Sequence, residues 1–175
     1  GFSAGAGTYN VEGSINDFLR VNLTANGLPT WMPSARIVYD YGPEHPLISG
    51  HSGHAFSVTH GNSNVIQEYQ GHRVDGGSAG HTRQGVVEIN VWLSKQAAGN
   101  QYSLRLRQAS DMVLDLFNSA RDTMLRDVYG GTGVTASLTA LVRFDRPEVI
   151  AGGPDVNPEV MRTRVRVPYI WVMRR

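Results

Sequence analysis

The sequence predicts an α+β fold, with a mainly antiparallel or mixed sheet and a central amphipathic helix packed on one of its faces. Between residues 103 and 120, apolar side chains recur at helical spacing. In GVVEINVWLSK and in VTASLTALVRF, every second residue is apolar or small, which is typical of strands with one buried face. Adjacent strands with a helix packed on one face argue for an α+β fold.

The N-terminal region predicts an amphipathic helix from about residue 14 to 25, with Ser14 as its N-cap and Gly27 as its stop. The apolar face of this helix consists of Ile15, Phe18, Leu19 and Leu23. Pro29 and Pro33 then interrupt the chain, and a short strand is expected from Ala35 to Tyr39.

Residues 42–84 are expected to form a long loop or hairpin excursion from the core. They are rich in Gly, Ser and Asn, and only residues 65–69 resemble a strand. A loop of this length is unusual inside a compact domain and indicates a functional segment. The excursion holds all six histidines, which are His45, His51, His54, His60, His72 and His81.

The strand after the excursion places alternate residues on opposite faces. The buried side is expected to hold Val87, Ile89, Val91 and Leu93, and the other side Glu88, Asn90 and Trp92. The central helix follows from about Ser103 to Ala120. Its apolar stripe consists of Ala109, Met112, Val113, Leu116, Phe117 and Ala120. Burial of its four large members stabilises the fold by about 1.5 to 3 kcal/mol each.

The C-terminal third predicts an extended segment at 124–128, a strand through VTASLTALVRF, a loop at 145–158 and a final strand. The expected inward residues of VTASLTALVRF are Val134, Ala136, Leu138, Ala140, Val142 and Phe144. In the final strand, Met161, Thr163, Val165 and Val167 face one side, and Arg162, Arg164 and Arg166 face the other. Because proline cannot donate to a ladder, Pro168 indicates an edge strand or a break.

Composition excludes several classes of protein. The length of 175 residues fits one domain, spanning 1–175. The chain has no cysteine, so it has no disulfide framework and no thiol nucleophile. No apolar run reaches the roughly 18 residues of a membrane span, and the N-terminus lacks signal-peptide features, so we expect no membrane association. The net charge of +1 argues against a strongly basic nucleic-acid binder.

The stretch GHSGH, at residues 50–54, resembles two kinds of catalytic motif. A serine nucleophile elbow requires glycine two positions after Ser52, where this chain has His54. His51 and His54 could share one face of a helix and bind a metal, but Gly50 and Gly53 oppose a helix there. A metal-dependent hydrolase that uses the histidine cluster at 45–81 remains an alternative. Otherwise we expect no cofactor, no metal and no enzymatic activity.

Arginine dominates the basic residues, since of the 16 only Lys95 is a lysine. Arg162, Arg164 and Arg166 would lie on one strand face, roughly 7 Å apart. A row of like charges is costly unless acids, phosphates or water compensate it. Three interpretations therefore stay open, namely a solvated face, ion pairs with a neighbouring subunit, and contact with DNA phosphates.

Residues 85–175 resemble a known family in their order of elements. GVVEINVWLSKQAAGNQYSLRLRQASDMVLDLF, RDVYG, SLTALVRFDRP and RTRVRVPYIWVMRR together resemble the tail-terminator and tail-completion (head–tail joining) proteins of tailed bacteriophages. The resemblance implies a structural virion protein, assembled in the host cytoplasm and located in the tail or neck. It would form a homo-oligomeric ring, usually a hexamer, that caps the tail tube. Its partners would be copies of itself, the tail tube protein and a head–tail connector or neck protein.

The resemblance also suggests where the ring contacts lie. A closed ring joins one patch of each copy to a different patch of the next. The first candidate patch is the set of basic residues Arg162, Arg164, Arg166, Arg174 and Arg175, and its candidate complement is the pair Asp111 and Asp115. His51 and His54 are then candidates for an interface loop. Another head-to-tail connector or neck protein is the nearest alternative, and DNA could pass close to the arginines.

Overall fold

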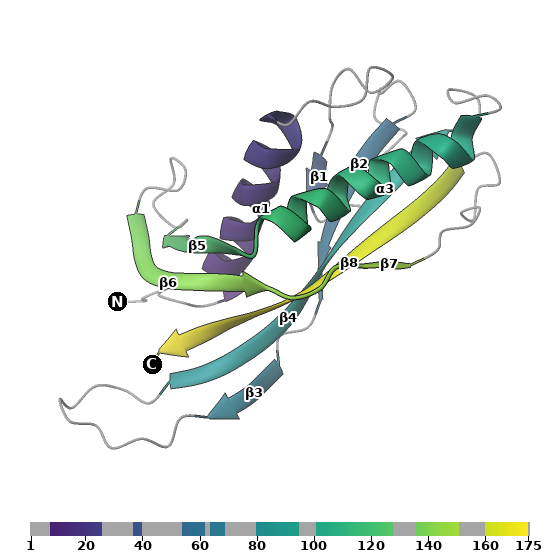
Figure 1. Cartoon of the computed structure of the whole chain (residues 1–175). Coiled ribbons are helices and arrows are strands. Elements are labelled where there is room, and N and C mark those ends of the chain that lie inside the picture. Colours follow the sequence, from purple (N-terminus) through teal and green to yellow (C-terminus); the bar gives the residue numbers. More distant parts are fainter. Residues whose placement is uncertain are drawn as a thin grey trace.

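The computed structural model describes residues 8–25, 37–39, 54–61, 64–68, 80–94, 101–127, 136–150 and 160–174. It contains helices α1 (Thr8–Ala25) and α3 (Tyr102–Ser119). The strands are β1 (Ile37–Tyr39), β2 (His54–His60), β3 (Asn64–Glu68), β4 (Gly80–Ser94), β5 (Asp122–Asp127), β6 (Ala136–Phe144), β7 (Glu148–Ile150) and β8 (Val160–Arg174). Both helices pack on the same face of one sheet (Figure 1), which confirms the predicted α+β fold.

The sheet is mixed, with strand order β1-β2-β4-β8-β6-β5. β1 and β2 are parallel, and the other described pairs are antiparallel. β4 and β8 pair along their whole length, from Gly80 opposite Arg174 to Ser94 opposite Val160. This long ribbon forms the centre of the sheet, and Figure 1 shows α3 running along part of it.

The predicted excursion at 42–84 is largely strand in its described parts. β2 pairs with the second half of β4, and β3 pairs with the first half, so these segments form a long hairpin. The hairpin alternative of the prediction is therefore correct and the loop alternative is wrong at 54–60, 64–68 and 80–84. In β2, histidine, serine and threonine surround Phe56 and Val58 and obscure the alternation.

Pro168 neither ends β8 nor places it at an edge, contrary to the expectation. β8 is central, with β4 on one side and β6 and β7 on the other. In an antiparallel strand, the N–H and C=O of one residue point to the same neighbour. The carbonyl of Pro168 accepts a hydrogen bond from Asp145 N at 2.8 Å. The missing N–H therefore faces residues 145–147, where the partner strand is already irregular.

The boundaries of the other helices and strands differ less from those predicted from the sequence. β7 occupies part of the segment 145–158 that was expected to be a loop. α1 begins at Thr8, before the expected start, so Ser14 is a buried residue inside the helix and not its N-cap. Val11 accounts for the difference because, with Ile15, it extends the apolar stripe one turn toward the N-terminus. α3 agrees with its prediction to within one residue at each end.

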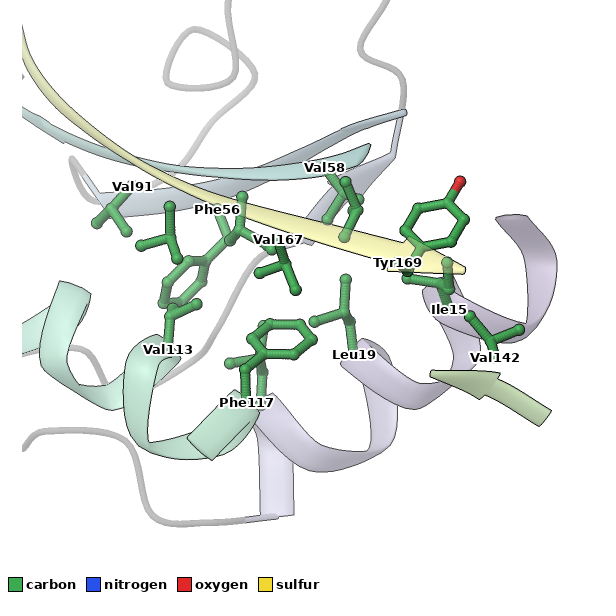
Figure 2. Packing of buried hydrophobic residues seen from close by; sticks show 14 of the residues in the cluster. Ile15, Leu19, Phe56, Val58, Val91, Val113, Phe117, Val142, Val167 and Tyr169 are labelled. Carbon is green, nitrogen blue, oxygen red and sulfur yellow. The ribbon is translucent and has the colours of Figure 1, made fainter. Parts of the chain in front are cut away.

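The core lies between the helices and the sheet. Its helical side comprises Val11, Ile15, Leu19, Leu23, Leu106, Ala109, Val113 and Phe117. Its sheet side comprises Phe56, Val58, Val87, Ile89, Val91, Leu93, Leu125, Val142, Val165, Val167, Tyr169 and Trp171. Figure 2 shows members of both sets interdigitating. The predicted inward residues of β4 are all buried here, which confirms that alternation.

Candidate subunit interface

The sheet face turned away from α1 and α3 carries three of the predicted site residues, Arg162, Arg164 and Arg166, and we call it the helix-distal face. Its positions on β4 and β8 alternate with the core positions, so it holds Glu88, Asn90 and Trp92 on β4. On β8 it holds Arg162, Arg164, Arg166, Pro168 and Ile170. Neither of the two described helices contributes to it, because both are packed in the core on the other face.

The three arginines of β8 form the predicted row, and β4 partly compensates their charge. Arg164 Nη1 lies 3.8 Å from Glu88 Oε1, and Arg166 Nη2 lies 3.7 Å from Glu88 Oε2. One carboxylate is thus shared by two guanidinium groups at the long end of ion-pair distance. Exposed pairs of this kind stabilise a protein by roughly 0 to 1 kcal/mol. On the opposite side of β8, Glu148 stands in register with Arg166.

Arg162 interacts with an aromatic ring. Its guanidinium carbon lies 5.0 Å from the centroid of the Trp92 ring. Trp92 Nε1 donates a hydrogen bond of 2.8 Å to Ser57 Oγ, and the ring is buried with Ala55 and Val160. Trp92 therefore lies on the predicted side of β4 but is not exposed. At this end of the row the arginine lies over a buried ring, whereas the side chains of Arg164 and Arg166 are 33% and 45% exposed.

Asn90, between Glu88 and Trp92, is only 2% exposed, and its Oδ1 has no hydrogen-bond partner. A buried acceptor without a donor costs about 1 to 3 kcal/mol. We therefore expect Asn90→Val to raise the free energy of unfolding by about 1 kcal/mol, measured by urea denaturation. Ser57→Ala is the control and should lower it, because Trp92 Nε1 loses its acceptor. A loss of stability in Asn90→Val would mean that Oδ1 is bonded in the folded protein.

An exposed apolar patch continues the helix-distal face beyond the arginines. It consists of Met124, Leu141 and Ile170, which are 45%, 40% and 38% exposed. Met124 pairs with Leu141 across β5 and β6, and Ile170 pairs with Arg143 across β8 and β6. This patch was not predicted from the sequence, although the sequence contains a signal for it. If Val142 and Phe144 face inward, then Leu141 between Ala140 and Val142 must face outward.

Asp111 and Asp115 are exposed on α3, as their predicted role requires. α3 buries Leu106, Ala109, Val113 and Phe117 against the sheet, so the two aspartates lie on the outer surface of the helical layer. The arginine row lies on the outer surface of the sheet layer. Within one protomer the structure therefore does not bring the acidic and basic candidates together, and they occupy opposite sides of a two-layer fold.

The remaining predicted residues are less informative. Arg174 is the last residue of β8, opposite Gly80, and its side chain is not described. Arg175 and His51 lie outside the described residues. His54 is the first residue of β2, opposite Leu93, and therefore belongs to a strand and not to a loop, while its role in an interface stays a prediction. The physical reason is that its backbone pairs with β4, which lies about forty residues further along the chain.

The histidines give no metal site in the described part of the chain, where no group of three or more candidate ligands occurs. His60 has the only described histidine side chain, and its Nε2 lies 2.7 Å from Asn16 Oδ1. This contact joins β2 to α1. His45 and His72 lie outside the described residues, and the side chains of His54 and His81 are not described. The alternative of a metal-dependent hydrolase thus stays a prediction.

Tyr169 is a buried ionisable residue whose pKa is clearly shifted. Burial raises the pKa of its hydroxyl far above the ordinary value, and the charge of Glu12 adds to the effect. The hydroxyl therefore stays neutral at physiological pH, and Tyr169 acts as a packing residue over β4.

In the described residues, no helix is both long and apolar enough to span a membrane.

Comparisons with known proteins give distant structural similarity. No protein-family model matches the chain, and no curated protein matches it significantly. One solved protein, known by a sequence identifier alone, is 12% identical over 89% of this chain and 94% of its own, with a TM-score of 0.47. A chain from the virion of a native gene transfer agent particle is 17% identical over 92% of this chain and 93% of its own, with a TM-score of 0.45.

Proposed function

We propose that this chain is a structural virion protein of a tailed phage, which acts like a tail terminator by assembling into a homo-oligomeric ring. The observation that carries the proposal is the helix-distal face. It combines three arginines, two neighbouring carboxylates (Glu88 on β4 and Glu148 on β7) and an exposed apolar patch, on a side that no described helix covers. An exposed apolar patch next to charged residues is typical of a protein interface. The resemblance of residues 85–175 to tail-terminator proteins supports this particular role.

The arrangement of charge is consistent with a ring. The basic face and the acidic helix surface are different patches on opposite sides of the protomer, so contact between them is heterologous. Heterologous contacts close into rings when the rotation between copies allows it. In this proposal the ring caps the tail tube and joins it to the head or neck, without catalysis. A head-to-tail connector would use the same contact in another position.

Electron microscopy of the purified protein, alone and with tail tubes, tests the proposal. We expect ring-shaped particles, or rings at one end of the tubes. Arg164→Glu should prevent ring formation and leave the free energy of unfolding within about 0.5 kcal/mol of the original. The control is Arg20→Glu on α1, which changes the net charge equally and should assemble normally. A strictly monomeric protein that never attaches to tubes contradicts the proposal.

A further inference from the structure

The outer surface of α3 carries one apolar and two acidic residues in a line. Leu104 is 63% exposed, and Asp111 and Asp115 follow it by seven and eleven residues. At about 100° per residue these three side chains point within roughly 20° of one direction. Along the helix axis, Leu104 lies roughly 10 Å from Asp111, and Asp111 lies roughly 6 Å from Asp115. Arg107 stands roughly 60° to one side of this line.

β8 carries the complementary order on the helix-distal face. Ile170 is exposed. Arg166 lies four residues before Ile170 in β8, and Arg164 lies two residues before Arg166. At the rise of a strand these steps are roughly 13 Å and 7 Å. β8 therefore presents one apolar residue followed by two basic ones. The distances between them are close to those between the one apolar and two acidic residues of α3.

From this match we infer how two copies dock. α3 of one protomer lies antiparallel to β8 on the helix-distal face of the next. Leu104 contacts Ile170 and the rest of the apolar patch. Asp111 faces Arg166, and Asp115 faces Arg164. The occupant of the helix-distal face is therefore a second copy of this chain. The inference rests on the proposed function, since it specifies the contact within the proposed ring.

Charge balance favours this contact over contacts that would bring two surfaces of the same charge together. Within the protomer, Arg164 and Arg166 share Glu88 at distances near the limit of an ion pair. Two carboxylates from a neighbour would give each arginine a partner of its own, and the bonds would strengthen as water leaves the interface. Assembly should then weaken as ionic strength rises, because the Debye length falls from about 10 Å at 0.1 M salt to about 3 Å at 1 M.

Reversal of the Asp115–Arg164 pair tests the docking mode by sedimentation of the purified full chain. Asp115→Arg and Arg164→Glu should each raise the dissociation constant of the oligomer by about tenfold or more. The double variant should recover most of the lost affinity, because Arg and Glu again face each other in every contact. The control is the reversed pair Asp17→Arg and Arg20→Glu, which form an i,i+3 ion pair on α1 and should change assembly by less than about twofold.

The outcomes separate this inference from the proposed function. If the original chain forms rings and Asp115→Arg assembles normally, or if the double variant is no better than the single ones, the ring stands and this docking mode is wrong. If the original chain is monomeric at all concentrations and also forms no ring on tail tubes, both fail. Leu104→Ser gives a second readout, since this exposed residue should be dispensable for folding, measured by circular dichroism, and necessary for full assembly. Normal assembly of Leu104→Ser also contradicts the docking mode.

Discussion

Replacement of Phe117 with alanine is expected to lower the free energy of unfolding by about 3 to 5 kcal/mol, the largest effect of any single change considered for this chain. Phe117 is 3% exposed and belongs to α3. Its ring centroid lies 5.8 Å from that of Phe18 on α1 and 5.0 Å, edge-on, from that of Phe144 on β6. The three rings join both helices to the sheet, so truncation leaves a cavity at the junction of three elements.

Urea denaturation monitored by circular dichroism measures this effect, with Asn118→Ala as the control. Asn118 is the next residue of the same helix and is exposed, so its replacement should change stability by less than about 0.5 kcal/mol. A loss below about 1 kcal/mol for Phe117→Ala would mean that neighbouring side chains refill the cavity. The structure opposes such a collapse, because Phe18 and Phe144 are themselves held 5.2 Å apart, centroid to centroid.

Gly85→Ala is expected to destabilise the protein by about 1 to 3 kcal/mol. Gly85 stands opposite Tyr169 in the β4–β8 ladder. A Cβ at Gly85 would lie 2.6 Å from both Cζ and Oη of Tyr169. Tyr169 is only 1% exposed and packs against Trp171, with ring centroids 5.6 Å apart, so its ring cannot move aside without disturbing the core. The sheet therefore requires glycine at this position.

Gly61→Ala is the matched control for this prediction. A Cβ there would lie 3.4 Å and 3.5 Å from atoms of Val86, which is close to ordinary contact, and the residue is exposed. Its effect on the free energy of unfolding, measured by urea denaturation, should be within about 0.5 kcal/mol. Equal losses in both glycine variants would show that the contact with Tyr169 does not control the response.

Together these features describe a fold whose two outer surfaces differ in charge. One face of the sheet and the inner side of both helices are buried in the core. The outer surface of α3 is left with Asp111 and Asp115, and the outer surface of the sheet with the arginines of β8. A contact between copies that buried both surfaces would use residues that the core leaves free.

The sequence by itself determined the elements whose pattern is local. The apolar stripe of α3, the alternation of Val87, Ile89, Val91 and Leu93, and the position of the arginines on one face of β8 all follow from periods of 3.6 and 2. Such periods depend on near neighbours in the chain, so no knowledge of the tertiary structure is needed. The same rule would have shown that Leu141 faces outward, had it been applied to that side of the strand.

The tertiary structure alone decided which strands pair and what each face meets. The hydrogen bonds of β2 and of the first residues of β4 come from partners far along the chain, so polar sequences such as HAFSVTH and GHTRQ could become strands. The central place of β8, despite Pro168, and the position of Glu88 between Arg164 and Arg166 also follow from register. Residues from β5, β6 and β8 form the apolar patch only because the sheet brings them together, and no local period carries that information.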